Sequence, residues 1–306
     1  MTSFAGPLLL VGGLVLVVGG AGFFFDGLLA SAARLRVSPF VLTVVVSGFE
    51  LENLAAGIAA NVKGFPNAAA GTFLGGTTFL ALGVAGLAAA AAPIEASFPR
   101  PVLVWAAVSP LPLLALGLDG DLTRPEGGAL VAWFAIALAG IAVSGRSLPW
   151  GEAPKRARHA LPRMLAGLAV LSGGGEVLGE GIQRVVTKLG VPESLLGNTA
   201  IAAAVEAEEV VRVAVPARRG RGDVALGNVF GTIAHFAAFN AGVIALVRPL
   251  ELDGVSRGLH LPVAAGSAIA LAALVRARRG LGRLDGAVLL ALYAAYVAAA
   301  ATLELA

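Results

Sequence analysis

Two apolar stretches of the sequence each carry acidic or amide side chains near their middle. They are residues 46–62, VSGFELENLAAGIAANV, and residues 202–220, AAAVEAEEVVRVAVPARRG. The polar residues concerned are Glu50, Glu52 and Asn53 in the first stretch, and Glu206, Glu208 and Glu209 in the second. A carboxylate inside a membrane-spanning helix is costly unless it is paired or functional, and its oxygens are ligands that hard cations such as Ca²⁺ prefer. These residue types therefore predict a cation site, provided that both stretches cross a membrane.

The composition is that of an integral membrane protein. Of 306 residues, 58% are hydrophobic and 13% are charged, and the mean hydropathy is +0.86. Soluble domains carry about 25% charged residues. Because the net charge of +3 is small and the basic residues are scattered, we expect a lipid bilayer and no nucleic acid as a partner. The absence of cysteine excludes disulfides, thiol catalysis and cysteine metal sites.

Ten segments are long and apolar enough, or nearly so, to cross a bilayer as helices, which takes about 20 residues each. They are residues 7–25, 38–62, 67–93, 101–118, 128–144, 161–183, 194–216, 223–247, 259–275 and 284–302. The first segment is interpreted as a span and not as a signal peptide, because no Lys or Arg precedes Arg34. The loops between the segments are short, and the longest polar one covers residues 145–160.

Positive charges predict the orientation of these spans, because cytoplasmic loops are enriched in Lys and Arg. The loop at residues 145–160 and the turns near Arg34, Arg218 and Arg278 fall on the more basic side. We therefore expect a multi-pass protein of the cell membrane with residues 145–160 in the cytoplasm. An even number of spans then places both termini outside the cell.

The two acidic stretches belong to an internal repeat. A shift of 156 residues aligns the polar positions and several glycines: Glu50 with Glu206, Glu52 with Glu208, Asn53 with Glu209, and Gly75 with Gly231. The halves begin five spans apart, so they have opposite orientations, an arrangement typical of secondary transporters with a site where the repeats meet. We predict an all-α polytopic membrane protein whose ten transmembrane helices form two inverted five-helix repeats. The repeats are residues 1–144 and 161–306, joined by a linker at residues 145–160.

The repeats resemble those of the calcium/cation antiporter superfamily, which contains the sodium/calcium and proton/calcium exchangers. Its motif is similar to G-T-S-x-P-E followed, after a glycine, by L-G-N-x-x-G-S-N. The second half carries GRGDVALGNVFGTIAHF at this spacing, with ALGN intact and Gly231-Thr232 in place of Gly-Ser. The first half carries GFPNAAAGTFLGGTTF with the same spacing of glycines. The resemblance covers essentially the whole chain and implies ten spans with external termini.

The resemblance also suggests ion ligands, although the motifs diverge. The family carboxylate falls on Glu209 and Asn53, whereas the later neutral ligand positions become Gly76, Leu80 and Phe236, with Thr232 retained. Residues three apart share a helix face, so Glu50 lies beside Asn53 and Glu206 beside Glu209. The carboxylate pair is therefore interpreted as moved by one turn. We expect Glu50, Glu206 and Glu209 to bind the metal ion, with Asn53 and Thr232 as neutral oxygen ligands.

Other polar residues in the spans have two interpretations each. Glu52 and Glu208 point away from the predicted ligands, and Glu208 with Arg212 is spaced for an internal ion pair that balances charge. His235 is more often a structural residue in such a helix than a proton relay. Glu176 has no counterpart in the first half and is a candidate for the ion path.

The predicted function is secondary active antiport by alternating access, without a cofactor and without enzymatic chemistry. The transported partners are inorganic cations, Ca²⁺ or another cation in exchange for Na⁺ or H⁺. A proton-coupled antiporter of monovalent cations on the same scaffold is the alternative. An intramembrane metal-dependent enzyme is a remote third option, since the chain has only three His and no H-E-x-x-H motif.

Overall fold

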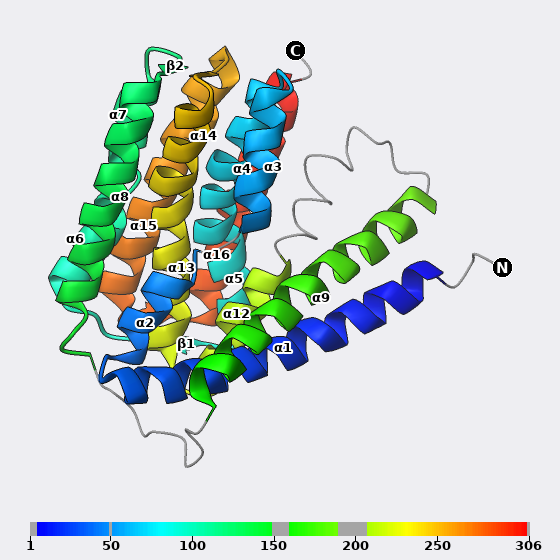
Figure 1. The fold of residues 1–306 in the computed structure, drawn as a ribbon, viewed down its shortest axis with the longest axis vertical. Helices are drawn as coiled ribbons and strands as arrows, with labels where there is room; N and C mark the ends of the chain where they lie inside the picture. Colours follow the sequence, from blue (N-terminus) through cyan, green and yellow to red (C-terminus); the bar gives the residue numbers. More distant parts are fainter. Residues whose placement is uncertain (1–4, 49–50, 149–158, 189–206, 305–306) are drawn as a thin grey trace.

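The computed structural model describes residues 5–48, 51–148, 159–188 and 207–304. A bundle of upright helices forms the main body, and two long helices, α1 and α9, lie obliquely against it and extend to one side (Figure 1). The first half contains α1 (Ala5–Leu35), α2 (Pro39–Val46), α3 (Leu51–Val62), α4 (Pro66–Thr78), η1 (Phe79–Val84), α5 (Ala85–Ala91), β1 (Ile94–Glu95), α6 (Arg100–Val108), α7 (Leu111–Gly117), β2 (Asp121–Leu122) and α8 (Arg124–Ser144). The second contains α9 (Ala160–Lys188), α12 (Ala207–Arg218), α13 (Gly222–Ala234), η3 (His235–Asn240), α14 (Ala241–Val247), β3 (Leu250–Glu251), η4 (Ser256–His260), α15 (Leu261–Arg278), β4 (Gly280–Leu281) and α16 (Arg283–Glu304).

Most of the predicted spans correspond to described helices, one of them is broken, and residues 194–206 of the span predicted at 194–216 lie outside the described residues. Within the described residues, seven helical stretches are long and apolar enough to cross a membrane, and a shorter apolar helix covers Asn53–Val62. The predicted span at residues 38–62 is divided into α2 and α3, and Ser47 and Gly48 form a turn at the end of α2. Ser38 begins α2 as its N-cap by accepting a hydrogen bond of 3.2 Å from the amide of Val41.

The 156-residue shift found in the sequence also relates the structural elements. The continuous stretch α4–η1–α5 corresponds to α13–η3–α14, and each stretch has a six-residue π-helical segment, beginning at Phe79 in one and at His235 in the other. Gly64 and Gly220, which precede these stretches, both have positive φ, at 85° and 70°. The repeated turn needs a left-handed conformation that glycine adopts without strain.

Two short antiparallel sheets connect the halves. β1 pairs with β4, with Ile94 opposite Leu281, and β2 pairs with β3, with Leu122 opposite Leu250. The labels β1 and β2 lie at opposite ends of the bundle (Figure 1). Each sheet therefore joins one strand from each half at a different end, as expected if the two halves are inverted relative to each other.

Helices α1 and α9 pack through two complementary rows of glycines. The α1 row is Gly13, Gly20 and Gly27, and the α9 row is Gly167, Gly174 and Gly181. A Cβ atom added at any of these six positions would lie 2.2–2.8 Å from backbone or Cβ atoms of the opposite helix. The pair is antiparallel, since Gly13 faces Leu178 and Gly27 faces Met164. Close backbone approach through small residues is a common way for helices to associate in membranes.

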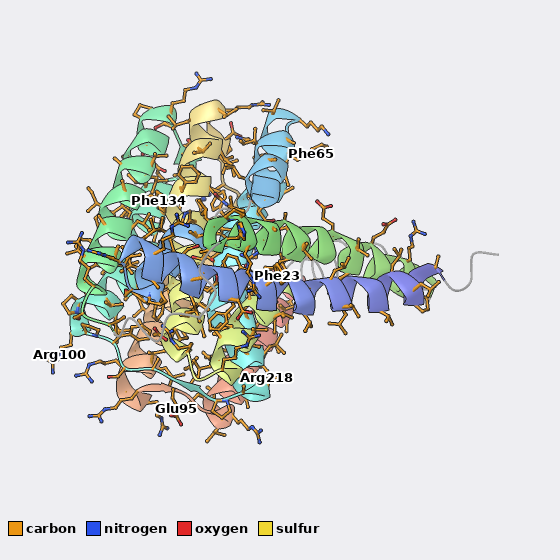
Figure 2. The ribbon with its side chains drawn as sticks, turned by 60° about the horizontal axis from the view of Figure 1, so that its bottom comes forward. Phe23, Phe65, Glu95, Arg100, Phe134 and Arg218 are labelled. Carbon is orange, nitrogen blue, oxygen red and sulfur yellow. The ribbon has the colours of Figure 1, made fainter. Side chains whose placement is uncertain are left out.

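The core of the bundle is centred on α13. All of its residues are buried except Asp223, and the large side chains around it include Phe40, Phe73 and Phe236, which expose none of their surface. Figure 2 shows Phe134 within the bundle, with Arg100, Glu95 and Arg218 toward one end of it and Phe65 toward the other. A helix that is buried on all sides is well placed to present polar groups to an enclosed site.

Candidate functional site

The centre of the candidate site is a group of three charged residues on α12. Glu209 exposes none of its surface, and Glu208 and Arg212 are 5% and 4% exposed. The Arg212 guanidinium forms an ion pair of 2.8 Å with Glu208 and a second, closer ion pair with Glu209. The spacings are i,i+4 and i,i+3, so all three side chains lie on adjoining faces of one helix. The ion pair predicted between Glu208 and Arg212 is thus present, together with one to Glu209.

Helix α13 supplies two polar side chains to this group. Asn228 donates a hydrogen bond of 2.7 Å from its side-chain nitrogen to Oε2 of Glu209. Its Oδ1 atom is buried and accepts no hydrogen bond from the part of the chain that the structure describes. Thr232 follows Asn228 by four residues, so both lie on the same face of α13. Asn228 therefore offers a buried amide oxygen beside a buried carboxylate.

The break after α2 brings a backbone carbonyl into the same place. Ser47 O accepts hydrogen bonds from Arg212 Nη1 at 3.3 Å and from Thr232 Oγ1 at 3.1 Å. Gly231 makes this approach possible, because a Cβ there would lie 2.7 Å from Val44 O and 2.2 Å from Ser47 Oγ. The two acidic segments predicted from the sequence therefore meet, through Ser47 of one and Arg212 of the other. Carbonyls at such breaks are typical cation ligands in transporters.

Apolar side chains pack at the motif positions that carry no polar residue in this chain. Phe236 and Leu80 expose none of their surface. A Cβ atom on Gly76 would lie only 2.4 Å from the ring of Phe236, so the ring occupies the space beside this glycine. Two divergent positions, one in each repeat, are thus in direct contact. The positions that the resemblance assigns to neutral oxygen ligands therefore carry no polar side chain at Gly76, Leu80 and Phe236, and the Phe236 ring is packed there.

His235 has the surroundings of a packing residue. Its Nδ1 lies 2.8 Å from Gly231 O, and its ring centroid lies 4.5 Å from that of Phe134. A Cβ on Gly48 would overlap the imidazole ring, at 1.8 Å from its Cγ atom, so the ring is packed against the turn that follows α2. This environment favours the structural interpretation of His235 over the proton relay.

The other predicted site residues lie either outside the described residues or on other helices. Glu50 and Glu206 lie outside the described residues, and so does the side chain of Glu52. Asn53 is half-buried on α3, and Glu176 is exposed on α9. Within the described ranges, no group of three or more His, Asp and Glu side chains is arranged to hold a metal ion. The predicted set of three metal-binding carboxylates therefore stays a prediction, with Glu209 as its one described member.

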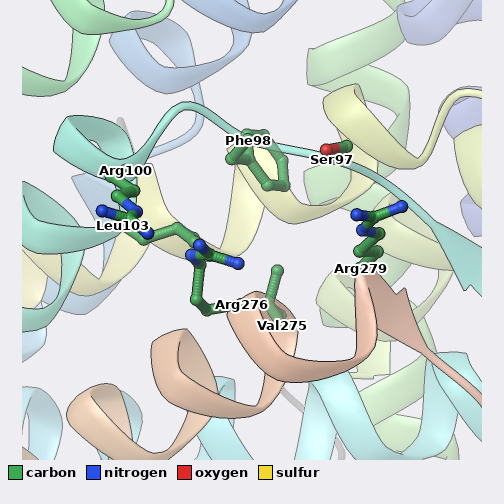
Figure 3. A pocket seen from close by; sticks show the side chains of 7 residues that line it. All are labelled: Ser97, Phe98, Arg100, Leu103, Val275, Arg276 and Arg279. Carbon is green, nitrogen blue, oxygen red and sulfur yellow. The ribbon is translucent and has the colours of Figure 1, made fainter.

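A separate hollow of about 200 Å³ lies between the start of α6 and the end of α15. Arg100, Arg276 and Arg279 surround it, with Phe98 at its side (Figure 3). None of the three arginines forms an ion pair with a carboxylate of the described chain. Three positive charges repel a cation, so this hollow does not belong to the cation site.

Comparison with known proteins identifies the family. The family model described as sodium/calcium exchanger protein matches residues 5–143 and 159–302. The chain belongs to the sodium/calcium exchanger protein family. It is 27% identical to the putative antiporter CaxA of Alkalimonas amylolytica over 307 aligned residues, which cover 93% of this chain and 95% of that protein. A shorter match, 29% identical over 109 residues, covers 36% of this chain and 31% of the sodium/calcium exchanger MaX1 of Methanosarcina acetivorans.

Solved structures of an exchanger share the fold of this family member. The sodium-calcium exchanger NCX_Mj, soaked with zero Na⁺ and Ca²⁺, superposes with a TM-score of 0.83 at 24% identity and covers 96% of this chain and 98% of that one. A second structure of NCX_Mj, soaked with 100 mM Na⁺ and 10 mM Sr²⁺, gives a TM-score of 0.81. The predicted family and the predicted multi-span helical fold with inverted repeats are therefore confirmed. The protein is a cation antiporter of this family and not an enzyme, which removes the intramembrane metalloenzyme from consideration.

Sequence reasoning missed two groups of the site. Asn228 is the last residue of the intact ALGN motif, and the retention of this motif was a signal that could have named it as a site residue. The Ser47 carbonyl had no such signal, because every residue carries a carbonyl group and only the break after α2 makes this one available.

Proposed function

We propose that this exchanger-family protein moves Ca²⁺ or a similar hard cation in exchange for protons, with Glu209 as the central ligand. The observation that carries the proposal is the wholly buried carboxylate of Glu209, which lies beside the amide of Asn228 and is linked to the Ser47 carbonyl through the Arg212 guanidinium. A buried carboxylate is costly in a membrane helix unless it is paired or used, and Glu209 has the Asn228 amide beside it in addition to the Arg212 guanidinium. The names of two relatives, an antiporter and a sodium/calcium exchanger, support a cation of this type.

The proposed ligand set contains only oxygen atoms. Glu209, Asn228 Oδ1, Thr232 and the Ser47 carbonyl come from described residues. Glu50, Glu206 and Asn53 complete the set through the predicted repeat of the acidic segments. Ca²⁺ takes about six to eight oxygen ligands, which is the size of this combined set.

Protons are the favoured counter-ion because of the apolar filling around Phe236. Na⁺ would need several neutral oxygen ligands of its own, and the positions of Gly76, Leu80 and Phe236 provide none. The proposed set, by contrast, contains more carboxylates than the single Arg212 guanidinium can neutralise, and a carboxylate can accept a proton after the cation has left. The same groups would then serve both ions in turn.

Exchange of a monovalent cation for protons is the second candidate, and Arg212 is the observation that favours it. Its positive charge offsets one of the two carboxylates with which it is paired. Among these three residues a single negative charge remains, and that charge matches a monovalent ion better than a divalent one.

We also infer the orientation and the division of the chain. Residues 145–160 lie in the cytoplasm and link the repeats at residues 1–144 and 161–306, and both termini lie outside the cell. The basic turns near Arg34, Arg218 and Arg278 support this orientation through the enrichment of positive charge in cytoplasmic loops.

Transport in proteoliposomes tests the function. Vesicles loaded at acidic pH, or loaded with Na⁺ at equal pH, are diluted into buffer with ⁴⁵Ca²⁺, and uptake is compared with the Glu209→Gln variant. We expect uptake that requires the pH gradient, collapses with a proton ionophore and is absent in the variant. Uptake that follows only the Na⁺ gradient would reject proton coupling. Absence of ⁴⁵Ca²⁺ uptake, together with proton-driven ²²Na⁺ uptake, would favour the monovalent alternative.

A further inference from the structure

The guanidinium of Arg212 is bound by groups that would suit a cation. Its contacts within the described residues include the carboxylates of Glu208 and Glu209 and the backbone carbonyl of Ser47, which lies at the break after α2. All of these are oxygen ligands, and the three side chains are almost wholly buried. The charge and the hydrogen-bond donors of the guanidinium thus stand among groups that a transported cation would use.

An ion pair that merely balanced a buried charge would not need this arrangement. One carboxylate is sufficient to neutralise one guanidinium, yet Arg212 bridges two carboxylates and also reaches a carbonyl on a different segment. Ser47 O also accepts a hydrogen bond from Thr232, a residue that the family resemblance places at a ligand position. Arg212 therefore contacts the proposed ligands themselves and not only a distant counter-charge.

We propose that Arg212 is a tethered cation that competes with the transported ion for Glu209 and the Ser47 carbonyl. The inference rests on the proposed function, since it concerns the same site. When the ion binds, the guanidinium gives up these two ligands and stays with Glu208. When the ion leaves, the guanidinium returns and satisfies Glu209, so the empty site does not hold an isolated buried carboxylate.

Glu208 is well placed to keep the displaced guanidinium. It is four residues from Arg212 on the same helix, and their ion pair does not involve Glu209 or Ser47. Its carboxylate lies against Gly175 of α9, where an added Cβ would be only 2.7 Å from Oε2. The glycine leaves room for the carboxylate between the two helices. Competition thus needs only a small movement of one side chain between two carboxylates that are adjacent in sequence.

Competition makes two variants change cation affinity in opposite directions. Arg212→Gln removes the competitor, so the ion should bind more tightly. Glu208→Gln removes the alternative partner of the guanidinium, which then holds Glu209 and Ser47 more strongly, so the ion should bind more weakly. A purely structural ion pair gives a different result, because both variants would then disturb the site in the same direction.

The double variant Arg212→Gln/Glu208→Gln separates competition from charge. It removes one positive and one negative charge, so the net charge of the three residues is the same as in the wild type. It nevertheless lacks the competitor and should bind the ion more tightly than the wild type does. The double variant also keeps the test valid if Arg212→Gln alone fails to fold. Arg212→Gln leaves two buried carboxylates without their counter-charge, whereas the double variant leaves only that of Glu209.

The measurement is equilibrium binding of ⁴⁵Ca²⁺ and ²²Na⁺ to the purified full-length protein in detergent, with thermal unfolding of each variant recorded in parallel. We expect about tenfold or greater tightening for Arg212→Gln and for the double variant, and weakening of similar size for Glu208→Gln. The matched control is Arg184→Gln, which breaks an i,i+4 pair with Glu180 of the same residue types on α9, where both side chains are half exposed. Its affinity should equal that of the wild type.

Equal or weaker binding by the double variant, with a folded protein, would overturn the proposal, as would weakening in both single variants. If the wild-type protein neither bound nor exchanged any cation, the proposed function itself would be rejected. The two failures are therefore distinguishable, because the second is seen without any variant.

Discussion

The glycine rows between α1 and α9 allow a stability prediction with an internal control. Gly20 faces the backbone of Leu171, and a Cβ added there would lie 2.6 Å from its nitrogen. Gly19, the next residue on the same helix, has no atom within 4 Å of an added Cβ. Gly20→Ala and Gly19→Ala therefore add the same methyl group to adjacent residues, one inside the contact and one outside it.

The magnitude follows from the missing space. Ordinary contacts of a Cβ begin at 3.4 Å, so Gly20→Ala must separate the helices locally by about 0.8 Å. The obstructing atoms belong to the backbone of α9 and cannot rotate away. A gap of this size forfeits about a quarter to a half of the dispersion energy of the affected contacts. We expect a loss of about 1–3 kcal/mol in stability, the usual cost of overpacking.

Gly19→Ala should act in the other direction. Alanine is favoured over glycine in a helix interior by up to about 1 kcal/mol, and nothing near Gly19 opposes the added methyl group. The measurement is the unfolding midpoint of each variant in mixed micelles, followed by circular dichroism. Equal stability of the two variants, or a lower stability of Gly19→Ala, would show that the two helices do not pack through the glycine rows.

Three further predictions concern the site and its surroundings. Gly76→Ser alone should lower the thermal unfolding midpoint, because the serine side chain meets the ring of Phe236. The double variant Gly76→Ser/Phe236→Asn should relieve this clash and strengthen ²²Na⁺ binding. An unchanged Na⁺ affinity would contradict the role given to the apolar side chains around Phe236. Glu50→Gln and Glu206→Gln should each abolish ⁴⁵Ca²⁺ transport while the protein is still inserted at normal levels, and normal transport by either variant would remove that residue from the ligand set. Asp26→Asn should lower the unfolding midpoint in low salt and have less effect in high salt, because Asp26 pairs with Arg163 at 2.9 Å and Arg219 at 2.7 Å, and exposed pairs are worth about 0.2–1 kcal/mol each. A salt-independent effect would contradict this last interpretation.

The local features of the site could be predicted from the sequence because helix geometry determines them. The pairs between Arg212 and the two glutamates depend only on spacings of three and four residues, which any regular helix brings together. The spans follow from the length of the apolar segments, because a bilayer requires backbone groups to be satisfied within each helix. The 156-residue repeat was visible because glutamates inside spans are rare, so a second set at the same spacing is informative.

Other features depend on contacts between residues that are distant in sequence. The sequence alone gave no indication that Phe236 would occupy the space beside Gly76, or that the glycines of α1 would face those of α9. The seven-residue spacing in both helices was a usable signal, but it names no partner. Side-chain packing selects partners through shape, and an apolar sequence is compatible with many pairings before the helices are assembled.

The sequence by itself determined that this is a membrane protein with repeated acidic spans, that Arg212 pairs with its helical neighbours, and that the motifs resemble those of cation exchangers. Only the tertiary structure decided that Ser47 presents its carbonyl to Arg212 and Thr232, and that Asn228 holds Glu209. The physical reason is that hydropathy and helical spacing are properties of a short segment, whereas a binding site requires atoms from separate segments to be brought within hydrogen-bond distance. A backbone carbonyl in particular has no signature in the sequence, and it becomes a ligand only where a helix ends inside the protein.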